Sequence, residues 1–249
     1  MLIHEGSART NKFDSRLAVS LAAIAGALNA AVFDAAGFFS GNMTGNVSAL
    51  SDRIASGRPM AALGFLAIII SFIFGATISS LLINAGRRKK IAGIYAYSIM
   101  LEAMLLALLG IIDITLSGLW RNAVIIVGLS FLMGLQNAVV TRISNARVRT
   151  THVSGMATDI GIEIGNLLDL IRGKAASDNE INSRSNLRLH IQTVASFLTG
   201  GIFGVILYHV IGGALFVGAA TILFFIARSG ISAAKAQVRT RLSSILLEK

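Results

Sequence analysis

The sequence predicts an all-α, polytopic membrane protein with six transmembrane helices, arranged as an inverted 3+3 repeat with two broken, re-entrant half-helix segments. Composition is the first observation: the mean hydropathy is +0.73, and 54% of the 249 residues are hydrophobic while 14% are charged. Soluble domains carry about 25% charged residues. The second observation is a series of apolar runs near the length of about 20 residues that a spanning helix needs. The third is a resemblance between the two halves of the chain.

Six apolar runs are candidate spans, and two further segments are helical in pattern but half polar. The candidate spans are 17–39, 60–84, 91–116, 123–140, 191–211 and 214–227. The half-polar segments, 45–57 and 155–171, each follow a break that contains glycine. The basic C-terminal segment 230–249 has the pattern of an amphipathic helix, which we expect on the membrane surface rather than across it.

The distribution of Lys and Arg predicts the orientation. With the N-terminal segment 1–16 in the cytoplasm, only Arg53, Arg58 and Arg121 of the 22 basic residues fall in outside loops. Because Lys and Arg concentrate in cytoplasmic loops, we expect both termini to be cytoplasmic.

Composition also argues against several classes of function. The chain has no cysteine, which excludes thiolate catalysis and Cys-ligated metals. The net charge is +10, but the basic residues lie between apolar runs, so we expect a lipid bilayer rather than nucleic acid as partner. His152 and His190 lack partners at metal-ligand spacing, so we expect a structural or surface role for both. No phosphate loop or nucleophile motif is present. We therefore expect no metal, no cofactor and no enzymatic activity.

An internal repeat relates residues 17–118 to residues 119–229. Asn29 falls on Asn137, and Thr44 falls on Ser154, when three pairs of segments are matched. These pairs are 25–33 with 133–141, 42–50 with 152–160, and 72–78 with 201–207. Three spans per copy is an odd number, so the second copy would enter the membrane from the opposite side, as in many secondary transporters.

The two breaks, at 41–45 and 150–155, are predicted to be one element used twice in opposite directions. Irregular backbone at membrane depth persists only where protein buries it or where it lines a watery cavity. The helix N-terminus that follows suits an anion or a carbonyl oxygen. The alternative is a pair of ordinary extramembrane loops with helix caps. The candidate substrate-binding residues are Asn29, Asn42, Thr44, Gly45, Asn46, Gln136, Asn137, Thr151, Ser154 and Gly155.

The paired asparagines have a second interpretation. Asn29 and Asn137 lie within spans, where an amide often serves only to hydrogen-bond one helix to another. Their matched places in the repeat also favour a role at the substrate site, and both interpretations stay open.

Several carboxylates are candidate intramembrane ionisable residues. Glu102 lies in the middle of a span, so it is a proton site, the partner of an arginine, or a protonated and hydrogen-bonded group. Asp34 and Asp113 lie nearer to span ends, where we expect them to reach water.

Asp159 and Glu163 share one helix face with Asn166, because the three recur at helical spacing. This face is either a solvated cytoplasmic surface or the lining of an inner vestibule. In the second case the nearby Arg142, Arg147 and Arg149 would neutralise it.

The string GALNAAVFDAAGFFSGNMTGNVSAL (26–50), with GLQNA (134–138) and TTHVSG (150–155), resembles the YoaK family of small bacterial integral membrane proteins of unknown function. The resemblance covers nearly the whole chain and implies a multi-pass protein of the bacterial inner (plasma) membrane. It implies no substrate or reaction. Members often carry Asp where this chain has Asn29, and an amide cannot replace a carboxylate as proton carrier, so the resemblance does not favour proton coupling at this position.

These observations favour a small secondary transporter or facilitator of an unidentified small solute or ion. Six spans are half of a typical twelve-span transporter, which favours a homodimer. The alternative is a non-transporting scaffold or sensor that contacts anionic lipid or a partner through its basic surface. A membrane-embedded enzyme ranks last because no nucleophile–base pair is recognisable.

Overall fold

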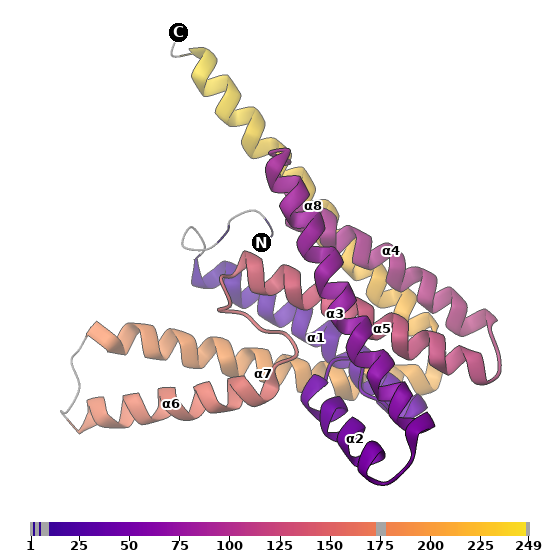
Figure 1. The fold of residues 1–249 in the computed structure, drawn as a ribbon. Helices are drawn as coiled ribbons and strands as arrows, with labels where there is room; N and C mark the ends of the chain where they lie inside the picture. Colours follow the sequence, from indigo (N-terminus) through magenta and orange to yellow (C-terminus); the bar gives the residue numbers. More distant parts are fainter. Residues whose placement is uncertain (1, 3–4, 6–9, 173–177, 248–249) are drawn as a thin grey trace.

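The computed structural model describes residues 2, 5, 10–172 and 178–247, and every regular element in these residues is an α-helix (Figure 1). The helices are α1 (Asn11–Ala36), α2 (Met43–Ala55), α3 (Pro59–Arg88), α4 (Ile94–Thr115), α5 (Leu119–Ile143), α6 (Val153–Ile171), α7 (Asp178–Ile211) and α8 (Ala214–Leu247). Within this part of the chain, six helices are long and apolar enough to cross a membrane: α1, α3, α4, α5, α7 and α8. The all-helical class and the six predicted spans are confirmed.

The helices extend beyond the apolar runs that predicted them. α1 begins at Asn11 because its polar first turn finds partners: Asp14 suits the positive end of the helix dipole, and its Oδ2 lies 3.2 Å from Nη1 of Arg147. α7 packs against α6, and Nε2 of His190 on α7 lies 3.9 Å from Oδ2 of Asp159 on α6. α8 continues without a break from Ala214 to Leu247, so the segment predicted as a surface helix prolongs the last span.

The helices pack in pairs that join distant parts of the chain. The most extensive contacts are those of α1 with α7, α3 with α5, and α4 with α8. α2 packs on α3, and α6 packs on α7 to the same extent; Figure 1 shows both as hairpins. Each long pair therefore contains one helix from the first half of the chain and one from the second.

Glycines permit close approach in two of these pairs. At each of four positions, a Cβ atom would collide with a backbone carbonyl of the partner helix. Small residues at such crossings let helix backbones pack closely in membranes. The contacts are Gly26 with Phe197 and Gly200 with Ala23 between α1 and α7, and Gly75 with Phe131 and Gly134 with Phe72 between α3 and α5.

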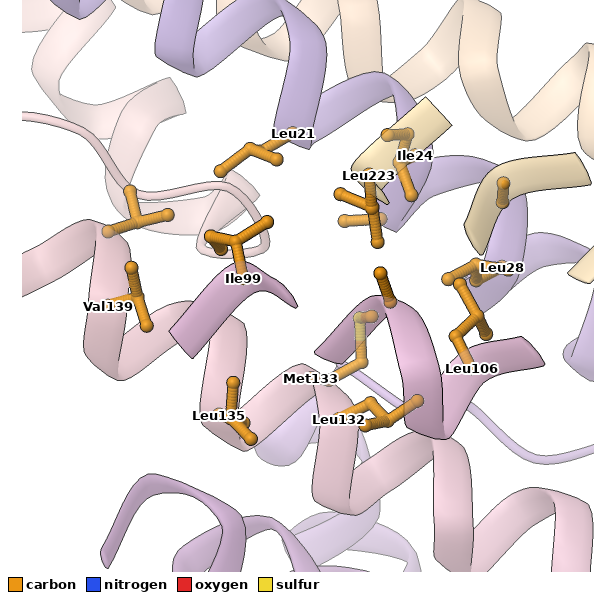
Figure 2. Packing of buried hydrophobic residues seen from close by; sticks show 14 of the residues in the cluster. Leu21, Ile24, Leu28, Ile99, Leu106, Leu132, Met133, Leu135, Val139 and Leu223 are labelled. Atoms are coloured by element: carbon orange, nitrogen blue, oxygen red, sulfur yellow. The ribbon is translucent and has the colours of Figure 1, made fainter. Parts of the chain in front are cut away.

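The main apolar core lies where α1, α4, α5 and α8 meet. Figure 2 shows Leu28 of α1, Leu106 of α4 and Leu223 of α8 within this buried cluster. Many large apolar side chains on the outer helix faces are exposed, among them Phe74 and Phe203. A soluble protein rarely exposes so much contiguous apolar surface, whereas a bilayer accommodates it.

Candidate functional site

The first break is anchored to the interior of α1. Gly37 ends the helix in a left-handed conformation (φ 74°), which turns the chain away. The chain then returns to Asn29, whose Oδ1 accepts hydrogen bonds from the Gly41 N–H (2.8 Å) and from the Ser40 hydroxyl (3.4 Å). One amide oxygen thus holds the break against α1.

Two further asparagines fix the start of α2. Asn42 is the N-cap residue, and its Oδ1 accepts a hydrogen bond from the Gly45 N–H at 3.1 Å. Asn46 is buried, and its Nδ2 donates to the Phe39 carbonyl at 2.9 Å. The direction in which α2 leaves the break is therefore set by side-chain hydrogen bonds on both sides of its first turn.

The second break is anchored to α5 by the matching asparagine. Oδ1 of Asn137 accepts a hydrogen bond from the Thr151 hydroxyl at 3.0 Å, and its Nδ2 donates to the Met133 carbonyl at 2.7 Å. α6 begins after His152, whose ring lies so close to Gly155 that a Cβ there would be 2.7 Å from it. With a larger residue in place of Gly155, the His152 ring would have to move.

The two breaks touch each other. A Cβ on Gly41 would lie 3.3 Å from Cγ2 of Thr151. A cavity of about 540 Å³, here called the break cavity, opens at this contact, and the first turns of α2 and α6 both face it. Its lining residues are Asn29, Phe39, Gly41, Asn42, Thr44, Gly45, Ser48, Thr151, His152, Val153, Ser154 and Phe197.

The break cavity is suited to hydrogen-bonding a small solute. The first N–H groups of a helix have no acceptor within the helix, and each helix N-terminus carries a partial positive charge. The hydroxyls of Thr44 and Ser154 and the imidazole of His152 add donors and acceptors. None of the described residues that line the cavity is acidic, so a neutral or anionic group meets no carboxylate there.

The structure brings six of the candidate substrate-binding residues to this cavity and places the others behind it. Asn137 reaches the wall only through Thr151, and Asn46 faces Phe39 instead. Gln136 is buried, and its Nε2 donates to the Leu21 carbonyl of α1 at 3.1 Å. Gly155 lies beneath His152. The six lining residues are Asn29, Asn42, Thr44, Gly45, Thr151 and Ser154.

His152, Phe39 and Phe197 line the cavity but were not among the candidates. His152 was expected to have a structural or surface role. In the match of 42–50 with 152–160, His152 falls on Asn42, which was a candidate. This correspondence could have placed His152 at the site as well. Phe197 comes from α7 and reaches the site only through the packing of α7 on α1.

The candidate ionisable residues lie away from the break cavity. Asp34 is part of an exposed pair with His209, with Oδ2 and Nε2 2.5 Å apart. Glu102 is fully buried on α4, and neither of its carboxyl oxygens has a hydrogen-bond partner in the described part of the chain. Asp159 lies 3.9 Å from His190, and one oxygen of Glu163 is buried without a partner among these residues.

The expectation that Asp113 reaches water is wrong. Its carboxylate is buried, because Arg121 and Tyr208 cover it: Nη2 of Arg121 lies 2.9 Å from Oδ1, and the Tyr208 hydroxyl donates to Oδ2 at 3.1 Å. The position of Asp113 near the end of a span did not predict its burial, because Arg121 and Tyr208 come from other helices, α5 and α7.

The three arginines expected to neutralise Asp159 and Glu163 have other partners. Arg142 donates to Asn84 at 2.6 Å, Arg147 pairs with Asp14 at 3.2 Å, and Arg149 lies 3.2 Å from Nδ1 of His152. In the part of the chain that the structure describes, no group of three or more metal-ligating side chains is found.

Six helices long and apolar enough to cross a membrane, with many large apolar side chains exposed on their outer faces, identify a multi-pass membrane protein. The chain belongs to the family described as "Protein of unknown function (DUF1275)", whose model matches residues 17–228. This is the YoaK family that the sequence resembles, so the resemblance is confirmed. No curated protein and no solved structure matches the chain.

The anchor at Asn29 gives a first prediction. Asn29→Leu leaves the Gly41 N–H without its acceptor, so the free energy of unfolding should fall by about 1–3 kcal/mol. Asn29→Asp keeps an acceptor oxygen in the same place, so at acidic pH, where the buried carboxyl group is neutral, it should remain closer to the wild type than Asn29→Leu does. Thermal unfolding of the purified protein in detergent compares the two variants. Equal stability of both would mean that the Asn29 oxygen does not hold the break.

Proposed function

We propose that this protein is a small secondary transporter or facilitator, which moves an unidentified small solute or ion across the bacterial inner (plasma) membrane through the break cavity. The observation that carries the proposal is the meeting of the two breaks at Gly41 and Thr151, with the first turns of α2 and α6 facing one cavity of about 540 Å³. Discontinuous helices whose N-termini point at a central site bind substrate in many secondary transporters.

The anchors support re-entrant breaks. Gly41 is bonded to Asn29, which lies seven residues before the end of α1 at Ala36, and Thr151 is bonded to Asn137, six residues before the end of α5 at Ile143. At 1.5 Å per residue, each break folds back along its helix by about 10 Å. Loops that remained outside the membrane would lie beyond the helix ends instead.

The packing of the helices supports an inverted repeat of 17–118 and 119–229. If α1 corresponds to α5 and α3 to α7, then the α1–α7 pair has its counterpart in α5–α3, and the α2–α3 hairpin has its counterpart in α6–α7. The glycine contacts follow the same exchange: Gly26 of α1 faces α7, and Gly134 of α5 faces α3. These contacts make Gly200 the counterpart of Gly75. The sequence match of 72–78 with 201–207 pairs Gly75 instead with Gly204, one helical turn further along α7.

The proposed topology places both termini in the cytoplasm. On the proposed cytoplasmic side, Arg88 ends α3 and Arg172 follows α6. On the opposite side, Arg58 precedes α3 and Arg121 lies in the first turn of α5. A homodimer would supply twelve spans, and crosslinking in native membranes tests it: a band at monomer mass alone would contradict this part of the proposal.

The function is tested by ligand-dependent stability. Purified protein in detergent is heated with a panel of ions and small metabolites across pH, since a ligand at 100 times its Kd adds about 2.7 kcal/mol to the free energy of unfolding. A ligand of the break cavity should raise the melting temperature of the wild type and should lose this effect in Thr44→Ala and Ser154→Ala. A hit is then followed by a flux assay in proteoliposomes.

Two hydroxyl residues outside the break cavity supply matched controls. Within the described residues, Thr77 and Ser229 each bond to a carbonyl of their own helix alone, so Thr77→Ala and Ser229→Ala should keep the ligand effect in full. A stabilisation of equal size in all four variants, or a ligand that binds but is not moved across the bilayer, would contradict the transporter proposal.

The alternative function is a scaffold or sensor that moves nothing. The observation that favours it is the C-terminal part of α8, which projects from the helix bundle in Figure 1 and carries the exposed residues Lys235 and Arg239. A basic helix of this kind can contact anionic lipid or an acidic partner. Under this alternative, Thr44→Ala and Ser154→Ala change stability alone.

A further inference from the structure

A second cavity, of about 600 Å³, lies between the start of α1, the start of α7 and the loop that follows α5. It shares no lining residue with the break cavity. Five of its lining side chains are basic, and this cavity is called the basic pocket below. They are Lys12, Arg16, Arg147, Arg184 and Arg188.

Helical spacing concentrates the charge of the basic pocket. Lys12 and Arg16 are one turn apart on α1, and Arg184 and Arg188 are one turn apart on α7. Like charges at this spacing destabilise a helix by roughly 0.2–0.5 kcal/mol per pair. Because Lys12, Arg16 and Arg188 face a common space, they also repel one another, and an anion between them would lower this repulsion.

The described residues that line the basic pocket supply no negative charge to it. Asp14 is buried behind the pocket and pairs with Arg147, whose Nη2 also donates to Asn11 at 3.0 Å. None of the described residues that line the pocket is acidic. Arg16 and Arg188 are exposed, and the described part of the chain contains no ion pair that would neutralise them.

The two helices that form the pocket are fixed relative to each other. The hydroxyl of Ser15 on α1 donates to Oε1 of Gln192 on α7 at 2.6 Å, directly at the pocket wall. The Arg147 guanidinium is held in place by Asp14 and Asn11. The two helices therefore keep a fixed spacing at the pocket, and Arg147 is already ordered, which lowers part of the entropy that a ligand must remove.

We propose that the basic pocket binds a phosphate-bearing anion, supplied either by the headgroup of an anionic phospholipid or by a soluble phosphate compound. The planar fork of Arg matches the oxygens of a phosphate group in a bidentate way. The volume lies within the range of ligand sites, roughly 300–1,000 Å³, and a monatomic anion would leave most of it unfilled. This inference does not depend on the proposed transport function.

The test uses the full-length protein in an uncharged detergent at low salt. One arm titrates inorganic pyrophosphate, and a second arm adds phosphatidylglycerol, with the zwitterionic lipid phosphatidylcholine as its control; the melting temperature is measured in each. Arg16→Gln/Arg188→Gln removes two charges from the pocket. Arg88→Gln/Arg239→Gln removes two exposed arginines elsewhere and leaves the pocket intact.

A pyrophosphate-dependent rise in melting temperature assigns the site to a soluble ligand, a rise with phosphatidylglycerol assigns it to lipid, and a rise with both supports recognition of the phosphate group alone. In each case the pocket variant should weaken the apparent affinity by about tenfold or more, while the Arg88/Arg239 variant keeps it. The pocket variant should fold at least as stably as the wild type without ligand, because repulsion is removed.

Two results would overturn the proposal. One is the absence of any stabilisation of the wild type by either probe. The other is an equal loss in both double variants, which would mean attraction to net charge and no defined site. Thr44→Ala should leave the response unchanged, so a failure here is distinguishable from a failure of the transport proposal.

Discussion

Gly26→Ala is expected to lower the free energy of unfolding by about 3 kcal/mol, at the upper end of what overpacking usually costs. The added methyl group would collide with the backbone carbonyl of Phe197 on α7. A side chain can rotate out of the way, but a backbone carbonyl cannot, so α1 and α7 must separate. Gly200→Ala meets the Ala23 carbonyl at the same crossing and should have a similar effect.

Gly218→Ala on α8 is the matched control for Gly26→Ala. Nothing lies within 4 Å of a Cβ built on Gly218, and alanine is favoured over glycine inside a helix by about 1 kcal/mol. The two substitutions should therefore change the melting temperature in detergent in opposite directions. If Gly26→Ala were as stable as Gly218→Ala, the close packing of α1 on α7 would be refuted.

The second large effect is expected at Asp113. Its carboxylate accepts from Arg121 at 2.9 Å and from the Tyr208 hydroxyl at 3.1 Å, and the side chain is only 2% exposed. Asp113→Leu would leave the guanidinium of Arg121, itself 29% exposed, without its counter-charge. Breaking a buried ion pair by removing one partner costs about 3–5 kcal/mol, and the partial exposure of Arg121 lowers the expected loss to about 2–4 kcal/mol.

A double substitution separates the loss of the ion pair from the loss of packing. Asp113→Leu/Arg121→Leu removes both charges and should recover most of the stability lost in Asp113→Leu, because no uncompensated charge remains. The coupling free energy from the four proteins of this cycle is the measured quantity. Losses that simply add would show that Asp113 and Arg121 do not stabilise each other.

Hydropathy located the spans well where lipid or core contacts decide the helix. The runs at 60–84 and 91–116 lie close to α3 (Pro59–Arg88) and α4 (Ile94–Thr115). It failed at the starts of α1 and α7, where polar residues are helical because of tertiary partners such as Arg147 for Asp14. The hydropathy of a segment does not predict such tertiary contacts.

The candidate site was predictable in part for a related reason. Thr44 and Ser154 belong to a pattern of glycine and polar residues that recurs in both halves of the chain. The repeat therefore predicted that both residues belong to one site. Phe197 was not, since it reaches the break cavity only because α7 crosses α1. The burial of Asp113 likewise depends on Tyr208 from another helix.

The interleaved pairing of α1 with α7 sets an order of events during synthesis. The chain must grow by roughly 170 residues after Gly26 before Phe197 exists, which at about 5–20 residues per second takes roughly 10–30 s. During that interval the glycine face of α1 has only lipid or the insertion machinery as neighbour. The first half of the chain therefore cannot complete its packing before the second half is made. In a chain that stalls after α5, α1 lacks its partner α7, and quality-control proteases can recognise the unpaired helix.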